Sequence, residues 1–324
     1  MRDILIAAVL ILFLPAGANA VFLNAPCYTC HGEKTFPGGY VDKAAFSRSV
    51  HGKFSCTACH VNITGFPHGA RQKVNCAICH LPGRGGAPKT PALQYKLSVH
   101  GMAVREGIAG APQCQTCHGS HDILPPGNPE SRIYRKNIPR LCARCHRKEY
   151  EVYKKSIHAR ALFDMGIERA AVCYDCHEEH RVPNVTSPRW LLWLVNKCGS
   201  CHKRELDTYR QTYHGQVTRL GYATVAKCPD CHGSHDILPP SDPGSTLSKA
   251  HILHTCKKCH PNASGGFTTF YAHPDDRDRR HYPRLYYTWL AMTILIVGVF
   301  AFFAAHTFLW AYRTLRERLK KKGE

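Results

Sequence analysis

The sequence predicts a mainly helical protein with extensive loops and one carboxy-terminal transmembrane helix. Three observations lead to this fold class. All 18 cysteines of the 324-residue chain fall in C-x-x-C-H pentapeptides. Strand-like alternation is scarce, whereas segments that follow pentapeptides, such as 147–155 and 203–211, have a helical pattern. Residues 285–312 contain no Asp, Glu, Lys or Arg and are long enough to span a bilayer.

Residues 1–20 have the three parts of a secretory signal peptide. Arg2 provides the positive charge, Ile4–Leu14 forms an apolar run, and Ala18-Asn19-Ala20 is an A-x-A cleavage site. The alternative is an uncleaved anchor, but the apolar run is shorter than the ~20 residues that a spanning helix needs. We therefore expect cleavage before Val21 and export of the chain.

Nine C-x-x-C-H pentapeptides account for every cysteine. This pentapeptide is the attachment signature of c-type haem, in which both thiols bind the porphyrin and the histidine is the proximal iron ligand. Zinc sites and reducible disulfides share C-x-x-C, but here the histidine is never missing. The predicted haem-binding cysteines are Cys27, Cys30, Cys56, Cys59, Cys76, Cys79, Cys114, Cys117, Cys142, Cys145, Cys173, Cys176, Cys198, Cys201, Cys228, Cys231, Cys256 and Cys259. The predicted proximal ligands are His31, His60, His80, His118, His146, His177, His202, His232 and His260.

Nine covalently bound c-type haems narrow the fold class to a multihaem cytochrome c built around stacked haems, in which the porphyrins replace a conventional apolar core. The formal net charge of +20 would otherwise suggest a nucleic-acid or anionic partner. Because each haem brings two propionates, we interpret the basic excess as compensation for them and expect no nucleic acid as a partner.

Internal repeats divide the region between the two ends. Gly119–Pro126 recurs letter for letter at Gly233–Pro240, and Glu178–Pro183 is a degenerate copy. Each copy follows one pentapeptide and precedes another, so the repeat is a haem pair. We therefore predict a three-haem module at 21–97 and a region of three haem pairs with a linker at 98–284. The Pro- and Gly-rich stretch 81–93 is predicted to link them.

With 22 histidines and nine proximal ligands, 13 remain, and the repeats point to nine as distal iron ligands. His121, His180 and His235 each lie three residues after a proximal histidine, too close to reach around the same porphyrin, so each should ligate a neighbouring haem. His251 and His254 compete with His273 for the last iron. The predicted distal ligands are His51, His68, His100, His121, His158, His180, His214, His235 and His273. The alternative for any one of them is a surface or propionate-bonding histidine.

Nine distal candidates for nine irons predict bis-histidine coordination throughout. A closed sixth position is typical of an electron relay, whereas a catalytic haem leaves it open. Methionine ligands would raise the reduction potential, but the region between the two ends contains just Met102 and Met165. Low potentials are therefore expected.

Residues 285–312 are the predicted transmembrane helix, and the basic segment 313–324 is the predicted cytoplasmic tail. Aromatic residues stand at both ends of the span. Arginines on its amino-terminal side weaken the charge asymmetry without reversing it. His306 lies within the span, where ionisable groups are costly. It is predicted either to ligate a b-type haem shared with a partner or to contact a quinone, and the alternative is a side chain that reaches towards the interface at Trp310.

The apolar segment Trp190–Val195 is too short to span a membrane. We expect it to pack on porphyrin faces, with an exposed docking patch as the alternative.

The two Gly-Ser-His-Asp-Ile-Leu-Pro-Pro copies, the Ser-Val-His-Gly motifs at His51 and His100, and the haem pairs resemble multihaem c-type cytochromes of anaerobic, metal- or sulfate-respiring bacteria. Phe302–Arg313 looks like the first membrane helix of inner-membrane c/b quinone oxidoreductases, which continues there into a cytochrome b. Here the chain stops at Glu324, so the resemblance implies that a cytochrome b is a separate subunit.

The resemblance implies a nonahaem cytochrome c in the bacterial inner membrane, with its haem domain in the periplasm. It would relay electrons in anaerobic respiration between a quinone-linked membrane partner and periplasmic redox proteins. The alternative is a multihaem reductase of nitrite, hydroxylamine or a sulfur oxyanion with one open haem. No C-x-x-C-K occurs in the sequence, and the distal candidates suffice for every iron, so we expect no catalytic residue.

Overall fold

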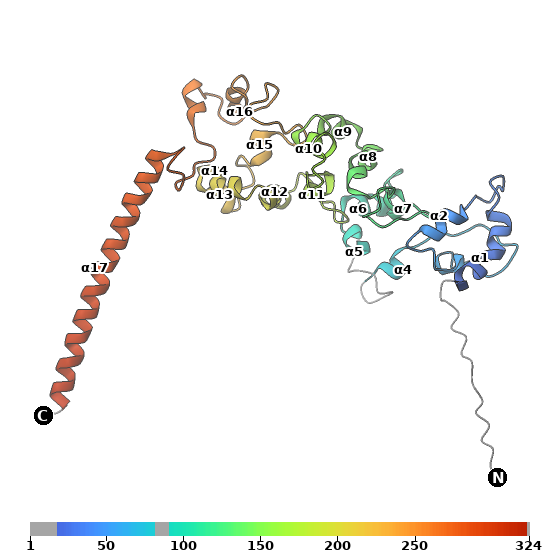
Figure 1. The fold of residues 1–324 in the computed structure, drawn as a ribbon, viewed down its shortest axis with the longest axis horizontal. Coiled ribbons are helices and arrows are strands. Elements are labelled where there is room, and N and C mark those ends of the chain that lie inside the picture. The colour runs from blue at the N-terminus through green and yellow to red at the C-terminus, as the bar shows by residue number, and fades with distance from the viewer. Residues whose placement is uncertain (1–17, 82–90, 323–324) are drawn as a thin grey trace, which may run out of the picture. The chain divides into compact units, whose positions relative to one another are not determined.

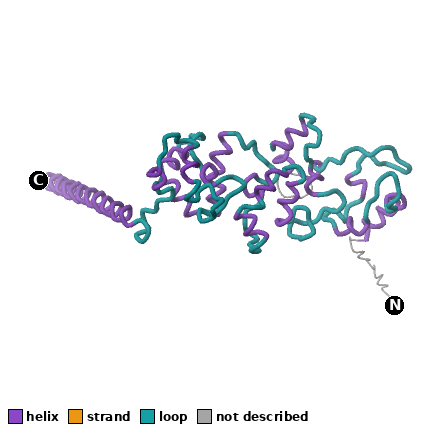
Figure 2. The backbone as a smooth tube through the Cα atoms, turned by 90° about the horizontal axis from the view of Figure 1, so that it is seen from above, coloured by secondary structure: helices purple, strands orange, loops and turns teal. Residues whose placement is uncertain are grey.

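The computed structural model describes residues 18–81 and 91–322, which form helices joined by loops (Figures 1 and 2). No β-strand occurs among these residues, so the predicted mainly helical, loop-rich fold is confirmed. The chain divides into two compact units. Unit 1 comprises Met1–Trp190 and His232–Ser248, and unit 2 comprises Leu191–Cys231 and Lys249–Glu324. The division into a three-haem module and a six-haem region remains a prediction.

Apart from α1, α12 and α17, every described helix has nine residues or fewer. The helices before residue 180 are α1 (Ala18–His31), α2 (Lys43–Arg48), α3 (Cys56–Cys59), α4 (Ala77–His80), α5 (Pro91–Lys96), α6 (Val99–Arg105), α7 (Cys114–His118), η1 (Arg135–Asn137), α8 (Ile138–Ala143), α9 (Arg147–Tyr153), α10 (Ile157–Phe163) and α11 (Cys173–His177). Those after it are α12 (Pro188–Cys201), α13 (Lys203–Gln211), α14 (Tyr213–Arg219), α15 (Cys228–His232), α16 (Ile252–Lys257), η2 (Gly265–Thr269) and α17 (Pro283–Lys322).

The first pentapeptide of each predicted haem pair forms one short helix, α7, α11 or α15. In each, the residue before the second cysteine accepts a hydrogen bond from the backbone N–H that precedes the first cysteine. The acceptors are Thr116 Oγ1 at 3.0 Å, Asp175 Oδ2 at 2.7 Å and Asp230 Oδ2 at 2.7 Å. This contact satisfies a backbone donor at the start of the helix and holds the C-x-x-C segment in a single turn.

Three further short helices each begin just before a predicted distal histidine. Their N-terminal caps are Ser98 for α6, Ser156 for α10 and Thr212 for α14, and each hydroxyl accepts a hydrogen bond from the third backbone N–H after it. All three caps are buried. The distal histidine is therefore the second residue of a capped helix in all three places, which gives it a fixed direction.

Apolar burial is limited, as expected for a chain without a conventional core. The described cluster of buried apolar side chains lies in unit 1 and consists of Ile138, Leu162, Ala170 and Val172. It packs α8 and α10 against the segment that leads into α11, and so supports the pentapeptide that begins at Cys173.

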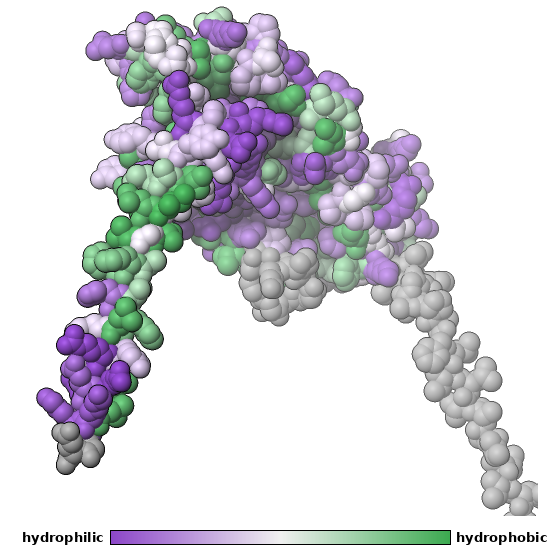
Figure 3. Space-filling view, turned by 60° about the vertical axis from the view of Figure 1, so that its left-hand side comes forward, coloured by the Kyte–Doolittle hydropathy of each residue, from purple (hydrophilic) through white to green (hydrophobic). Residues whose placement is uncertain are grey.

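α17 is a single helix of 40 residues that contains the whole predicted span 285–312. It is long and apolar enough to cross a membrane, and none of its side chains is buried. Figure 3 shows hydrophobic residues along its middle and hydrophilic ones near the carboxy-terminal end. The predicted basic tail continues the same helix as far as Lys322. Residues 1–17 of the predicted signal peptide and 82–90 of the predicted linker lie outside the described residues.

Candidate haem-binding sites

Seven proximal histidines face a predicted distal histidine. Each pair joins one C-x-x-C-H histidine to one distal candidate, and the ring centroids lie 5.9–6.2 Å apart. In unit 1 the pairs are His31 with His68, His80 with His51, His60 with His121, His146 with His100, His118 with His180, and His177 with His235. In unit 2 the pair is His260 with His214.

This separation fits an iron atom between the two rings. Two metal–nitrogen bonds of about 2 Å, with about 1 Å from each nitrogen to its ring centre, place two axial imidazole centroids about 6 Å apart. Rings packed directly on each other would approach to about 3.5–4 Å. The paired histidines, with two thiols beside each proximal one, therefore fit c-type haem held by bis-histidine coordination.

Hydrogen bonds orient two of these rings. His31 Nδ1 donates to the Gly39 carbonyl oxygen at 2.8 Å, and His68 Nδ1 donates to the Gly69 carbonyl oxygen at 2.8 Å. Because a carbonyl oxygen can accept but not donate, the proton lies on Nδ1 in both rings. Nε2 is then the nitrogen with a free lone pair, and the hydrogen bond from Nδ1 makes each imidazole a stronger ligand.

Burial lowers the pKa of several paired histidines, and the facing imidazole lowers it further. This holds for His51, His60, His100, His118, His177 and His214. The neutral imidazole, which is the form that binds a metal, is therefore favoured at these positions.

Backbone hydrogen bonds bring the distal histidines of unit 1 together from distant parts of the sequence. The residue before one distal histidine donates to the carbonyl oxygen two residues after another. The three bonds run from Val50 to Ile123 at 2.8 Å, from Val99 to Val182 at 3.0 Å, and from Ile157 to Ile237 at 2.8 Å. The same contact thus recurs at His51, His100 and His158. It explains why each of these histidine segments is accompanied by one copy of the repeat that contains His121, His180 or His235.

Cysteines of consecutive pentapeptides also lie next to each other. The first cysteines of neighbouring motifs are within hydrogen-bonding distance in four cases, namely Cys27 with Cys56, Cys76 with Cys114, Cys142 with Cys173, and Cys198 with Cys228. The second cysteine of a motif approaches the next motif in three cases, namely Cys59 near Cys76 and Cys79, Cys117 near Cys142 and Cys145, and Cys231 near Cys256 and Cys259. Burial, together with the charges of Asp230 and the neighbouring thiols, raises the pKa of Cys231 to about 11.

These contacts put the pentapeptides of each unit in sequence order. Motifs one to six follow one another in unit 1, with first-cysteine and second-cysteine contacts alternating, and motifs seven to nine follow one another in the same way. No disulfide joins any of the 18 cysteines, all of which lie in the described part of the chain. The arrangement provides closely spaced attachment sites in a row.

The remaining predicted ligands are placed as follows. His158 is the second residue of α10 and is half-buried. His273 Nδ1 donates to the Glu205 carbonyl oxygen at 3.1 Å and lies 3.2 Å from Thr208 Oγ1, and these contacts orient the ring. The axial roles of His158 and His273, and the proximal roles of His202 and His232, stay predictions.

Three other side chains outside the paired histidines are placed by the structure. The ring of Trp190 lies parallel to His177, with centroids 5.7 Å apart, beside a predicted axial ligand. Packing of the segment 190–195 on a porphyrin face stays a prediction. His281 is exposed, and its Nδ1 lies 2.8 Å from Asp278 Oδ2. His306 is exposed on α17.

Sequence reasoning assigned no role to two kinds of residue that hold the sites. Asn24 is buried at 2% exposure; its Nδ2 donates to the Phe54 carbonyl oxygen, and its Oδ1 accepts from the Cys56 backbone N–H. Three tyrosines, each five residues before a distal histidine, make equivalent long-range hydrogen bonds. The signal for the tyrosines was their repeated spacing, whereas Asn24 has no repeated counterpart.

Two family models match parts of the chain. Residues 17–81 match cytochrome c7 and related cytochrome c, and residues 106–151 match the doubled CXXCH motif. These ranges contain the first five pentapeptides. No curated protein and no solved structure is significantly similar to the chain. With the paired imidazoles and the row of thiols, the matches indicate a multihaem c-type cytochrome with covalently bound haems, and such a protein suggests electron transfer.

Proposed function

We propose that the protein is a nonahaem cytochrome c anchored in the bacterial inner membrane by α17, with its haems in the periplasm. It relays electrons between a quinone-linked membrane partner, such as a cytochrome b, and periplasmic redox proteins of anaerobic respiration. Bound haem supplies one-electron redox chemistry. The polypeptide holds each iron between two imidazoles, keeps neighbouring sites close and limits solvent access.

The observation that carries this proposal is the row of adjacent pentapeptides. Each cysteine contact between consecutive motifs brings two attachment sites side by side, as electron transfer through a chain of cofactors requires. In seven of the nine sites a second histidine faces the proximal one, which favours closed, electron-relaying irons.

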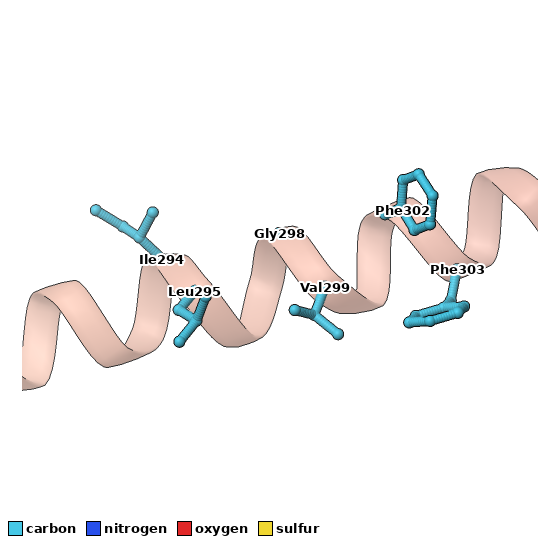
Figure 4. Close-up of a pocket in the computed structure, with 6 residues that line it drawn as sticks. All are labelled: Ile294, Leu295, Gly298, Val299, Phe302 and Phe303. Carbon is cyan, nitrogen blue, oxygen red and sulfur yellow. The ribbon is translucent and has the colours of Figure 1, made fainter.

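The partner in the membrane is inferred from α17. A shallow apolar groove on this helix is lined by Ile294, Leu295, Gly298, Val299, Phe302 and Phe303, and Figure 4 shows these residues along one stretch of the helix. His306 follows Phe302 by four residues and therefore shares its face. We propose that this face packs against the membrane partner and that His306 ligates a b-type haem there or contacts the quinone, because an exposed imidazole inside a span is costly.

The test uses membranes that contain the full-length protein and its native partners. Intact mass is expected to give nine haems per chain, and a menaquinol analogue is expected to reduce them. His306→Ala should slow this reduction, whereas the neighbouring Thr307→Ala, on another face of α17, should not. Fewer than nine haems per chain would contradict the nonahaem assignment. Release of the protein from membranes by high salt without detergent would contradict the anchor. Equal rates of haem reduction in both variants would contradict the role of His306.

A further inference from the structure

Three tyrosines occupy the same position relative to the three predicted haem pairs. Tyr95, Tyr153 and Tyr209 each precede a predicted distal histidine by five residues. Each hydroxyl donates to the backbone carbonyl oxygen two residues before the first cysteine of a pentapeptide. The acceptors are Pro112 at 2.7 Å, Ala171 at 2.8 Å and Ala226 at 2.8 Å. The same bond in three copies indicates a shared role.

In unit 1 this bond joins two different haem sites. Tyr95 belongs to the segment that carries His100, which faces His146 of the fifth pentapeptide. Its hydroxyl is bound to Pro112, immediately ahead of the fourth pentapeptide. The fourth and fifth pentapeptides are neighbours, since Cys117 lies near both cysteines of the fifth. Tyr95 therefore connects the distal ligand of the fifth site to the attachment segment of the adjacent fourth site.

Unit 2 repeats the arrangement independently. Tyr209 belongs to the segment that carries His214, which faces His260 of the ninth pentapeptide. Its hydroxyl is bound to Ala226, ahead of the eighth pentapeptide, and also to Thr218 Oγ1 at 2.8 Å. Cys231 of the eighth pentapeptide lies near both cysteines of the ninth. The tyrosine again spans two adjacent sites.

The tyrosine backbone is fixed as well as its side chain. Ser98 Oγ donates to the Tyr95 carbonyl oxygen at 2.6 Å, and Thr212 Oγ1 donates to the Tyr209 carbonyl oxygen at 2.7 Å. These are the same hydroxyls that cap α6 and α14. Burial raises the pKa of both tyrosines, so the phenols stay protonated and can donate. A rigid ring thus links a capped, histidine-bearing helix to the neighbouring pentapeptide.

We propose that Tyr95 and Tyr209 are positioning residues that fix the separation and orientation of two adjacent haems, the fourth with the fifth and the eighth with the ninth. Tyr153 makes the equivalent link between the segment of His158 and the sixth pentapeptide. The proposal rests on the proposed function, because it requires haem at these sites. It adds that the distance between neighbouring haems is set by a side chain that ligates neither of them.

The test compares Tyr209→Phe with Tyr213→Phe in the full-length protein purified in detergent. Tyr213 adjoins the same distal histidine but is 74% exposed, so it serves as the matched control. In Tyr209→Phe we expect full haem content by intact mass, an unchanged low-spin EPR spectrum, and an altered Soret circular-dichroism couplet from the coupled haem pair. Amide exchange in α14 should accelerate by about five- to tenfold, because the segment that carries this helix loses its hydrogen bonds to Ala226 and to Thr218 of α14. The control Tyr213→Phe should match the wild type in haem content, EPR spectrum, Soret couplet and amide exchange.

Tyr95→Phe is the second variant and should show the same changes in α6. A couplet and exchange rates equal to those of the wild type in both variants would overturn the proposal. Loss of haem from either variant would also overturn it, because the tyrosine would then act in attachment and not in positioning. If the wild type itself lacked these haems, the proposed function would fail instead, and the mass measured on the wild type separates the two results.

Discussion

Replacing Glu178 by glycine is expected to stabilise the region around α11. Glu178 directly follows a pentapeptide histidine and has φ 60° and ψ 166°, a conformation that is nearly specific to glycine. The corresponding residues of the two other haem pairs are Gly119 with φ 87° and Gly233 with φ 82°. A side chain in this region costs about 1–3 kcal/mol, whereas the extra freedom of glycine in the unfolded chain costs about 0.5–1 kcal/mol. The net gain is therefore about 1 kcal/mol.

Thermal unfolding of the full-length protein in detergent measures this gain. For a unit of about 150–250 residues, a gain of about 1 kcal/mol in the free energy of unfolding raises Tm by about 2–4 °C. Glu179→Gly is the matched control, because the adjacent residue does not have a positive φ and gains nothing from glycine. It should leave Tm unchanged or lower it. A Tm for Glu178→Gly at or below that of the wild type would refute the argument that this position is strained.

Three other perturbations test separate parts of the structure. Asn24→Ala removes two hydrogen bonds to the backbone, each worth about 0.5–1.5 kcal/mol, and should lower the unfolding free energy by about 1–3 kcal/mol in denaturant titration; an unchanged midpoint would contradict this role. The carboxylate of Asp278 accepts hydrogen bonds from the backbone and ring of His281, and Arg204 adds to them, which lowers its pKa to about 2. Its stabilising effect is complete above the ordinary pKa of 3.8 and disappears as the pH falls through about 2, so Asp278→Asn should flatten this acid step in a plot of Tm against pH. His68→Met should raise the reduction potential of one haem in a spectroelectrochemical titration, because methionine is the higher-potential ligand, and an unchanged titration would argue against His68 as an axial ligand.

The sequence predicts the fold class because covalent attachment leaves a strong local signature. Every pentapeptide specifies a thiol pair and a histidine within five residues, and the composition of 285–312 specifies one long apolar helix, which the structure extends to Pro283–Lys322. The repeat also indicates that His121, His180 and His235 serve neighbouring sites. The structure brings them opposite His60, His118 and His177, each of which belongs to the pentapeptide two before the one that the distal histidine follows, so the facing site is a different one but not the adjacent one in sequence.

The pairing itself could not be read from the sequence. His121 faces a histidine some sixty positions earlier, and that choice depends on backbone bonds such as Val50 to Ile123, which no local pattern encodes. The strain at Glu178 was in principle visible, since the aligned repeats have glycine there. The tyrosine links required knowledge of which carbonyl each hydroxyl reaches, and this depends on how consecutive pentapeptides fold against one another.

The most direct test of the relay is low-temperature EPR of the oxidised full-length protein, integrated against its haem content. Closed bis-histidine sites predict that every ferric haem is low-spin, with nine haems per chain. A high-spin signal of about one haem per chain would reveal an open iron. The electron-relay account would then be contradicted, and a reductase would explain the protein better.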